Sequence, residues 1–239
     1  MTDGAIIVTG GSGEIGAAIC ARAAADGYDV FNLDIGAPRP GSVGRWCQID
    51  LADAASAKTV LAGIVAEAPV LRLVNCAGMI RPASLDDTSV DDFDAVIALN
   101  LRAAMLCAQA VAPGMRRAGF GRIVSISSRA SLGKHLRTAY AASKAALHGM
   151  TRTWALELAK DGVTVNAVAP GSIETALFRH GNPPDDPRTQ AILSSIPVGR
   201  IGTPDDVANA VSFFLDRRSG FVTGQTLYVC GGLTVGLSR

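Results

Sequence analysis

The stretch Thr9-Gly10-Gly11-Ser12-Gly13-Glu14-Ile15-Gly16 lies near the start of the chain, between two contrasting segments. The four residues before it, Ala5-Ile6-Ile7-Val8, are apolar and mostly β-branched, which predicts a buried strand. The residues after it, 15–25, predict a helix. Three of its glycines fit the spacing GxGxxG, which allows a tight turn and lets backbone N–H groups approach a pyrophosphate. The stretch therefore predicts a strand–turn–helix unit that binds a dinucleotide.

Further apolar runs follow along the chain, separated mostly by helical segments. They cover residues 29–34, 46–49, 70–75, 122–127, 163–169 and 226–229. Strands that alternate with helices pair in parallel through right-handed crossovers, and near-continuous apolar strands indicate a sheet covered on both faces. We predict an α/β fold: a single-domain, Rossmann-type, doubly wound parallel sheet of about seven strands with helices on both faces.

Composition narrows the class of protein. The 239 residues suit one domain over 1–239, and 49% hydrophobic with 18% charged residues is enough for a large core. A net charge of +1 gives no field that would recruit nucleic acid or an anionic membrane. The most apolar long stretch, Phe93–Met115, is broken by polar residues and indicates a buried or subunit-facing helix.

The first predicted strand leaves no room for a signal peptide, so we expect a cytoplasmic protein. The five cysteines are widely spaced and form no CxxC pair, so we expect reduced thiols and no metal site.

Asp34 ends the second predicted strand, near where an acidic residue binds the ribose 2′-hydroxyl of a dinucleotide. A carboxylate there would also repel a 2′-phosphate, and the nearest following cation is Arg39. We therefore expect NAD rather than NADP. The alternative is an ordinary aspartate in a turn at the end of a strand.

Tyr140 and Lys144 stand four residues apart, which places them on one face of a helix. A tyrosine has a pKa of about 10, and a neighbouring ammonium together with an oxidised nicotinamide ring would lower that pKa. Upstream, Ser128 ends a predicted strand, at the edge where parallel α/β sheets bind ligands. Its hydroxyl could stabilise charge on a carbonyl oxygen. Ser127 is the competitor, because alternation along a strand lets only one of the two face the site.

The whole chain resembles the short-chain dehydrogenase/reductase family, and its 3-oxoacyl carrier-protein reductase-like members in length and motif order. The motifs that carry the resemblance are the glycine loop, Asp50, Asn75-Cys76-Ala77-Gly78, Asn100, Ser128, Tyr140 with Lys144, and Pro170-Gly171-Ser172-Ile173-Glu174-Thr175.

The resemblance implies an enzyme that interconverts an alcohol and a carbonyl, with Tyr140 as acid/base. Ser128 would orient the carbonyl, Lys144 would hold the nicotinamide ribose, and Asn100 would bind a water of a proton relay. The implied cofactor-binding residues flank the adenine, line the cleft and hold the nicotinamide carboxamide: Gly10, Ser12, Gly13, Glu14, Ile15, Gly16, Asp34, Asp50, Leu51, Asn75, Ala77, Gly78, Tyr140, Lys144, Pro170, Gly171, Ile173 and Thr175.

A homotetramer is also implied, with a homodimer as the alternative. The apolar helix that carries Asn100 and the helix 141–159 suit the subunit contacts.

The sequence departs from the family pattern in three places. Glu14 stands where the usual TGxxxGxG loop has glycine, and we expect its side chain to point to solvent; the alternative is a position near the pyrophosphate, where it would weaken binding. Cys76 replaces the second asparagine of NNAG, and the spacing from Ser128 to Tyr140 is one residue shorter than is common.

Residues 176–200 contain Asn182-Pro183-Pro184-Asp185-Asp186-Pro187, which is typical of a loop. We expect a mobile segment that covers the substrate; the alternative is a surface loop without a role. The expected substrate-binding residues are Ser128, Arg129, Tyr140 and Arg179. Further basic residues (Lys134, His135, Arg137, His180) predict an anionic substrate group such as a carboxylate, a carrier phosphate or a coenzyme A thioester. The alternative is that these cations are solvated or paired with acids such as Asp185 and Asp186.

The sequence thus predicts an NAD-dependent oxidoreductase for a secondary alcohol and ketone, with a small-molecule substrate and no nucleic-acid or membrane partner. One alternative is an NADPH-dependent 3-oxoacyl thioester reductase. Another is a non-catalytic nucleotide-binding protein, which would not need Ser128, Tyr140, Lys144 and Asn100 together.

Overall fold

Seven parallel strands form one sheet in the computed structural model of the chain, which describes residues 4–235. Their order across the sheet is β3-β2-β1-β4-β5-β6-β7, which confirms the predicted doubly wound topology. Each strand lies within one residue of its predicted range: β1 Ala5–Thr9, β2 Asp29–Asp34, β3 Arg45–Gln48, β4 Val70–Asn75, β5 Gly121–Ile126, β6 Val163–Pro170 and β7 Thr226–Val229. The strand order reverses between β1 and β4, and ligands bind at such a switch point.

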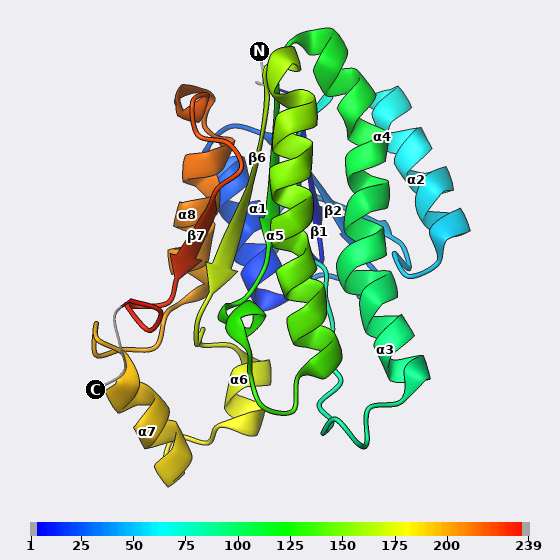
Figure 1. Ribbon diagram of the computed structural model, residues 1–239. Helices are drawn as coiled ribbons and strands as arrows, with labels where there is room; N and C mark the ends of the chain where they lie inside the picture. The colour runs from blue at the N-terminus through cyan, green and yellow to red at the C-terminus, as the bar shows by residue number, and fades with distance from the viewer. Residues whose placement is uncertain (1–3, 236–239) are drawn as a thin grey trace.

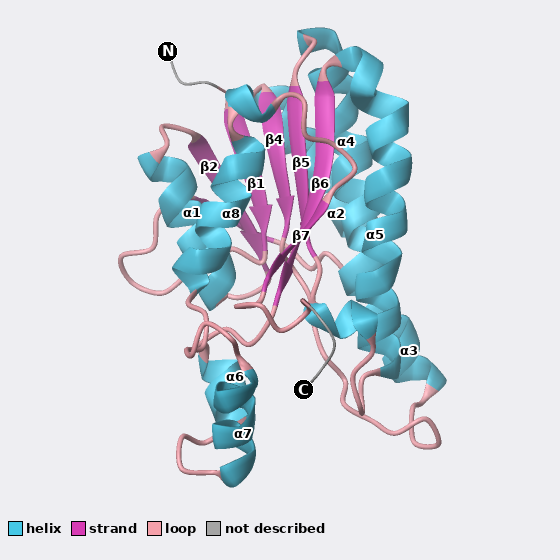
Figure 2. Cartoon of the chain, turned by 60° about the vertical axis from the view of Figure 1, so that its left-hand side comes forward, coloured by secondary structure: helices cyan, strands magenta, loops and turns pink. Residues whose placement is uncertain are grey.

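Helices cover both faces of the sheet (Figures 1 and 2). One layer holds α1 (Glu14–Ala25) and α8 (Pro204–Leu215), and the other holds α2 (Ala54–Glu67), α4 (Ala103–Ala118) and α5 (Thr138–Leu158). Strand β1 shows why helices are needed on both faces of the sheet, because successive side chains of a strand point to opposite faces. Ile6 and Val8 pack in the core cluster that includes α1 and α8, whereas Ile7 packs in the cluster that includes α2 and α4.

Helix ends follow local capping rules. Asp53 begins α2 by accepting hydrogen bonds from two N–H groups of its first turn. Thr203 begins α8 with a reciprocal capping box to Asp206, and Pro204 takes the first helical position. Such caps each contribute about 1 kcal/mol.

The helical run Val90–Ala118 is long and apolar enough to cross a membrane by length and composition, but half of its most apolar window is buried inside the protein. It comprises α3 (Val90–Ile97), a π-helical turn η1 (Ala98–Arg102) and α4, which packs on β4. The run is therefore a core helix. Its π-turn contains Asn100, which is almost fully buried.

Residues 176–200 are not the continuous loop that the sequence predicts. They form α6 (Ala176–Gly181) and α7 (Pro187–Ser195), which lie below the carboxyl edge of the sheet (Figure 1). Thr175 caps α6 through the N–H of Phe178, and Asp186 caps α7. The proline-rich run that suggested a loop instead separates the two helices and starts the second, because proline fits the first turn of a helix.

Two arginines lie inside the sheet at the opposite edge. Arg72 of β4 and Arg122 of β5 are 0% and 3% exposed. The Nε atoms of Arg72 and Arg122 donate to the carbonyls of Leu215 and Asp216, each at 3.2 Å. Arg122 also stacks on the ring of Phe120, 4.4 Å from its centroid. These cations bind the C-terminal carbonyls of α8, where the helix dipole favours positive charge.

Candidate active site

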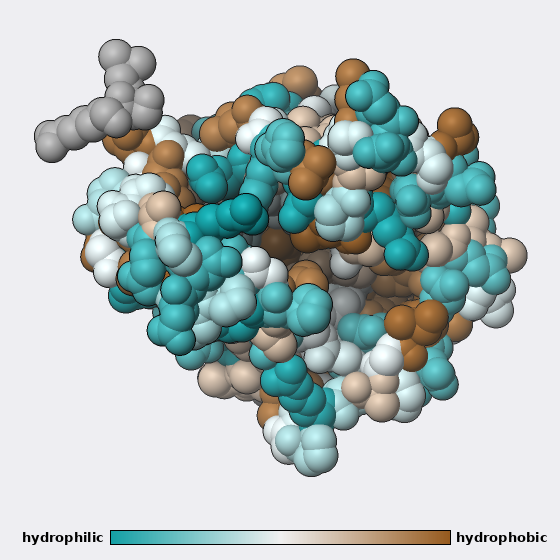
Figure 3. All heavy atoms as spheres, turned by 90° about the horizontal axis from the view of Figure 1, so that it is seen from below, coloured by the Kyte–Doolittle hydropathy of each residue, from teal (hydrophilic) through white to brown (hydrophobic). Residues whose placement is uncertain are grey.

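The carboxyl ends of the strands share one edge of the sheet, at the bottom of Figure 1. Figure 3 looks onto that edge and shows a central hollow with apolar residues inside a largely polar rim. The loops that follow β1, β4, β5 and β6 carry the residues that the sequence analysis singled out. The structure therefore brings these loops together at the edge where parallel α/β sheets bind ligands.

Lys144 is buried on α5, one turn after Tyr140, and is 4% exposed. Its Nζ donates a hydrogen bond to the carbonyl of Ile126 at 2.7 Å and lies 5.7 Å from the centroid of the Tyr140 ring. Burial lowers the pKa of Lys144 from 10.5 to about 8, because removal from water disfavours the charged form. The thiol of Cys76 opposes this shift.

The pKa of the Tyr140 hydroxyl is raised above 10, chiefly by burial. A hydrogen bond with Ser128 and the positive charge of Arg137 act in the opposite direction. The sequence predicts that Lys144 lowers the pKa of Tyr140; in the structure burial dominates and raises this pKa, and Arg137 supplies the positive charge that opposes the rise. The sequence identifies Arg137 only as one of the basic residues for an anionic substrate, and its effect on the pKa of Tyr140 is not predicted there.

The structure separates Ser128 from its competitor. Ser128 faces Tyr140 and also accepts a hydrogen bond from Ala130 N–H at 3.1 Å, which starts the short helix η2 (Arg129–Leu132). Ser127 is 2% exposed and points the other way, with its Oγ 2.8 Å from the carbonyl of Lys144. The one-residue shortening between Ser128 and Tyr140 leaves their hydrogen bond intact.

Asn100 is held by protein groups. Its Oδ1 accepts from Met79 N–H at 2.8 Å, and its Nδ2 donates to the Met79 carbonyl at 3.0 Å and to Ser143 Oγ at 3.1 Å. A Cβ built on Gly78 would lie 3.2 Å from Asn100 Oδ1 and 3.4 Å from Lys144 Nζ. Asn100 and Lys144 therefore border the same narrow space, but the amide ties η1 to the loop after β4 and to α5.

The glycine loop has the close packing that a dinucleotide site needs. Gly10 has φ +68°, and a Cβ on Gly16 would lie 2.1 Å from the Gly10 carbonyl oxygen, so neither position accepts a side chain without strain. The carboxylate of Asp34 accepts hydrogen bonds from the N–H groups of Ser12 and Gly36, both at 3.0 Å. Asp34 thus lies against the glycine loop, and its role towards a ribose hydroxyl stays a prediction.

The side chain of Glu14 does not point to solvent, so that expectation is wrong. One of its oxygens accepts from Ala176 N–H at 2.6 Å, and the other pairs with Arg39 at 3.2 Å. These two partners, an N–H group and a guanidinium, hold the carboxylate against the protein. Glu14 therefore joins the glycine loop to the first residue of α6.

The remaining residues that the sequence predicts for the cofactor differ in their surroundings. Thr9 Oγ1 accepts from the N–H groups of Cys76 and Ala77, and burial raises the pKa of the Cys76 thiol to about 11. Leu51 packs in the core, Asp50 accepts a hydrogen bond from Ala52 N–H, and Gly171 lies against Cys230. The other predicted positions of this kind are Gly13, Ile15, Asn75, Pro170, Ile173 and Thr175.

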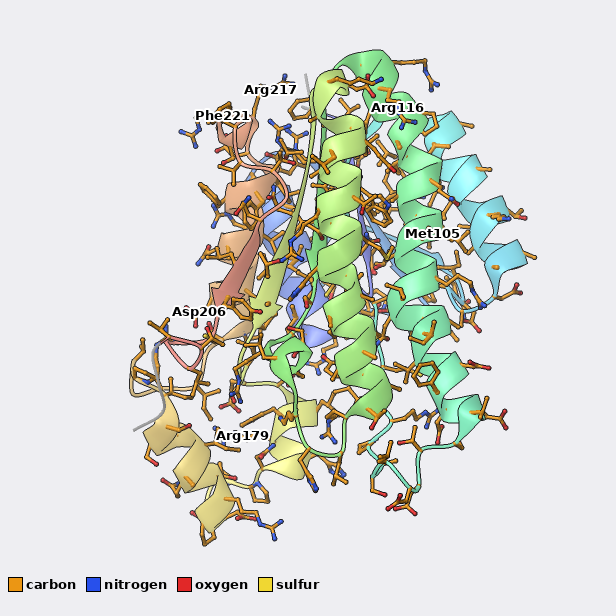
Figure 4. The ribbon with its side chains drawn as sticks, in the orientation of Figure 1. Met105, Arg116, Arg179, Asp206, Arg217 and Phe221 are labelled. Atoms are coloured by element: carbon orange, nitrogen blue, oxygen red, sulfur yellow. The ribbon has the colours of Figure 1, made fainter. Side chains whose placement is uncertain are left out.

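The two predicted anion-binding arginines differ in their surroundings. Arg179 belongs to α6, and its side chain pairs with both carboxylate oxygens of Glu174 (Figure 4). Among residues 4–235, Arg129, Lys134 and Arg137 have no carboxylate partner. Burial and the charges of Arg137 and Arg129 lower the pKa of Lys134. The free positive charge therefore lies in the segment between Ser128 and Tyr140, not on Arg179.

Comparison with known proteins gives the family. A family model described as enoyl-(acyl carrier protein) reductase matches residues 11–234. The chain is a short-chain dehydrogenase/reductase. It is 40% identical to the short-chain reductase protein NovJ of Streptomyces niveus, over 95% of this chain and 92% of the relative. The family resemblance stated from the motifs is confirmed, and the protein is an oxidoreductase that acts on CH–OH or keto groups.

A second relative is the (2S)-[(R)-hydroxy(phenyl)methyl]succinyl-CoA dehydrogenase subunit BbsD of Thauera aromatica, 49% identical over 160 residues. That match covers 67% of this chain and 63% of the relative. Among solved structures, a 3-oxoacyl (acyl-carrier-protein) reductase of Agrobacterium tumefaciens with bound NADP superposes with a TM-score of 0.87. It is 29% identical and covers 95% of this chain and 93% of its own.

Proposed function

We propose that this short-chain dehydrogenase/reductase interconverts a secondary alcohol and a ketone with NAD as cofactor. The observation that carries the proposal is the placement of Ser128, Tyr140 and Lys144 in one group beside the glycine loop, with Lys144 buried and the two hydroxyl groups partly exposed. The chain acts as one domain over residues 1–239, in which residues 176–200 cover the substrate.

Each residue has a role in the reaction. The Tyr140 phenolate takes the proton of the alcohol during oxidation, and the Tyr140 hydroxyl returns a proton to the carbonyl oxygen during reduction. Ser128 donates a hydrogen bond to the substrate oxygen, which stabilises charge that develops there. We infer that the Lys144 ammonium, 5.7 Å from the centroid of the Tyr140 ring, adds its charge to that of Arg137 and favours the Tyr140 phenolate. Asn100 fixes Met79 and Ser143 around Lys144, and the water of the proton relay is expected beside it.

The residues of the cleft fit a nicotinamide dinucleotide, which accepts or supplies the hydride when bound. Gly10 and Gly16 leave room for the backbone to approach the pyrophosphate, and Gly78 leaves the space beside Lys144 open. Asp34, at the end of β2, supports NAD, because its carboxylate would accept from a ribose hydroxyl and repel a 2′-phosphate.

The substrate carries an anionic group. Arg129, Lys134 and Arg137 support this class, because their charges are unpaired and one of them reaches Tyr140 electrostatically. Hydroxy acids and hydroxyacyl thioesters both have such a group. The second candidate is an NADPH-dependent 3-oxoacyl thioester reductase, which is favoured by the name and the bound NADP of the Agrobacterium structure.

We place the enzyme in the cytoplasm as a homotetramer, with a homodimer as the alternative. All five cysteines are free thiols, the state that the cytoplasm maintains. The outer surfaces of α4 and α5 expose Met105 (Figure 4) and Leu156, which are 37% and 84% exposed and suit a subunit contact.

The test combines a substrate screen with one variant. Purified protein is assayed by nicotinamide absorbance with NAD⁺ and NADP⁺ against 3-hydroxybutyrate, 3-hydroxybutyryl-CoA and 2-butanol. We expect turnover of an anionic substrate with NAD⁺, and we expect Tyr140→Phe to lower kcat by about 10²–10⁴-fold while NAD⁺ binding is retained. A Tyr140→Phe enzyme with more than a tenth of the wild-type kcat contradicts the assignment of the acid/base. Preference for NADP⁺ with the thioester supports the second candidate.

A further inference from the structure

Lys144 is held at two points by two consecutive residues at the end of β5. The Ile126 carbonyl accepts from its Nζ at 2.7 Å, and Ser127 Oγ donates to its main-chain carbonyl at 2.8 Å. Ser127 N–H in turn donates to the Val168 carbonyl of β6 at 2.8 Å, so the serine is fixed to the sheet. The turn of α5 that carries Lys144 is therefore fastened to the sheet through Ser127.

His148 completes this contact from the next turn of α5. Its Nε2 lies 2.7 Å from Ser127 Oγ, and its ring meets the Tyr228 ring of β7 edge-on, with centroids 6.4 Å apart. Arg152 is the charged group that acts on it, and burial and Arg152 both lower the pKa of His148.

The chemistry of the groups fixes the direction of the hydrogen bonds. A carbonyl oxygen can only accept, so the Ser127 hydroxyl proton points to Lys144. Ser127 Oγ must then accept from His148, which makes the neutral imidazole the Nε2–H form. The resulting chain runs from His148 through Ser127 to the carbonyl of Lys144.

We propose that Ser127 and His148 are positioning residues that hold Lys144 where its ammonium acts on Tyr140. The inference rests on the proposed function of Tyr140 and Lys144. It adds two residues that touch neither the reacting atoms nor the dinucleotide. Reactions in such sites are sensitive to small displacements, since a misplacement of 1 Å can lower a rate about 100-fold. Loss of either contact frees the Lys144 turn to move away from Ile126 and from the tyrosine.

The direct readout is the ionisation of Tyr140, which needs no substrate. The chain has three tyrosines, and the ultraviolet phenolate signal of Tyr140 is obtained as the difference between a protein and its Tyr140→Phe counterpart. Titrations are run with saturating NAD⁺ on the wild type, Ser127→Ala, His148→Leu and His148→Gln. Glutamine keeps an N–H donor of similar reach, whereas leucine does not.

The titrations use NAD⁺ because the charge of its nicotinamide lowers the ionisation midpoint of Tyr140 towards the range where Lys144 is protonated. There we expect Ser127→Ala and His148→Leu to lower the ionisation constant of Tyr140 by about three- to tenfold, and His148→Gln to restore most of it. Ser212→Ala is the matched control, because it removes a buried hydroxyl that bonds Asp26 on the α1–α8 side of the sheet; its titration should match the wild type.

Titrations of Ser127→Ala and His148→Leu that superpose on the wild type overturn the positioning role and leave the proposed function standing. Equal effects of His148→Leu and His148→Gln overturn the role of His148. If Ser127→Ala does not fold, the comparison of these two His148 variants alone tests the proposal. If NAD⁺ does not lower the ionisation midpoint of Tyr140 in the wild type and Lys144→Ala does not change it, the proposed function itself fails.

Discussion

Lys144→Met should make the protein more resistant to unfolding near neutral pH while it abolishes activity. Lys144 is 4% exposed, and burial lowers its pKa from 10.5 to about 8. The folded protein therefore binds this proton more weakly than the unfolded chain does. A tenfold change in an ionisation constant corresponds to about 1.4 kcal/mol, so burial of the charged lysine costs about 3 kcal/mol at pH 7.

The dependence on pH has a definite sign. Because the pKa is lowered in the folded state, the unfolded chain binds more protons between pH 8 and 10.5, and the wild type gains stability as the pH rises through this window. At pH 9.5 the remaining cost is about 1 kcal/mol. Methionine has no such cost at either pH, but it loses the hydrogen bond to Ile126, which offsets part of the gain by about 1.5–3 kcal/mol. Whatever the size of that loss, the two pKa values of Lys144 alone set how the difference between variant and wild type changes with pH.

The quantity to measure is the free energy of unfolding in urea of the variant minus that of the wild type, at fixed protein concentration. We expect this difference to fall by about 2 kcal/mol from pH 7 to pH 9.5, or roughly 4–8 °C in Tm. Lys160→Met, at an exposed lysine just after α5, should show a difference that does not change with pH. A Lys144→Met difference that is equally constant would show that the lysine is not buried as a destabilising cation, and the reasoning would be refuted.

Three further outcomes follow from the site. Asp34→Ala should erode the preference for NAD over NADP, measured as the ratio of kcat/KM for the two cofactors; an unchanged ratio, or equal values in the wild type, contradicts the role of Asp34. The rate of alcohol oxidation should rise with pH towards the raised pKa of Tyr140, because only the hydroxylate accepts the proton, and a flat profile between pH 6 and 10 opposes this. Arg129→Gln should raise KM for an anionic substrate about 10–100-fold, whereas Arg179→Gln, whose charge is already paired with Glu174, should change it less than threefold; equal effects would return the anion site to Arg179.

The strands of the sheet could be predicted because their pattern is local. Strands β1, β4 and β6 have apolar residues on both faces, which predicts that helices cover both sides of the sheet without saying which helices do so. Glycine positions are equally local, since Gly10 and Gly16 are dictated by the turn between β1 and α1. The motif that binds the dinucleotide is contained in this one turn and was readable without the fold.

Contacts between distant segments were not readable. Arg72 and Arg122 interrupt apolar strands, and only the fold supplies the aromatic rings and the end of α8 that stabilise them. Glu14 looked solvated because its partner, Ala176, is 162 positions away in sequence. From the sequence, Ser127 is only an alternative to Ser128, since nothing in the spacing indicates that His148 contacts the Ser127 hydroxyl.

Residues 176–200 show a different limit on what composition can predict. Residues 182–187 are rich in proline and aspartate, and the same residue types end one helix, form a turn and cap the next. Composition identified the break correctly but not the short helices on either side, because helices of six and nine residues give little periodic signal.

The bridge from Glu14 to Ala176 has a consequence for the order of events in turnover. It connects the loop that would hold the pyrophosphate to the segment that would close over the substrate, so the two cannot move independently while it is formed. If the dinucleotide binds beneath this bridge, the connection predicts an ordered mechanism in which the cofactor binds first and leaves last, and product-inhibition patterns would test that order.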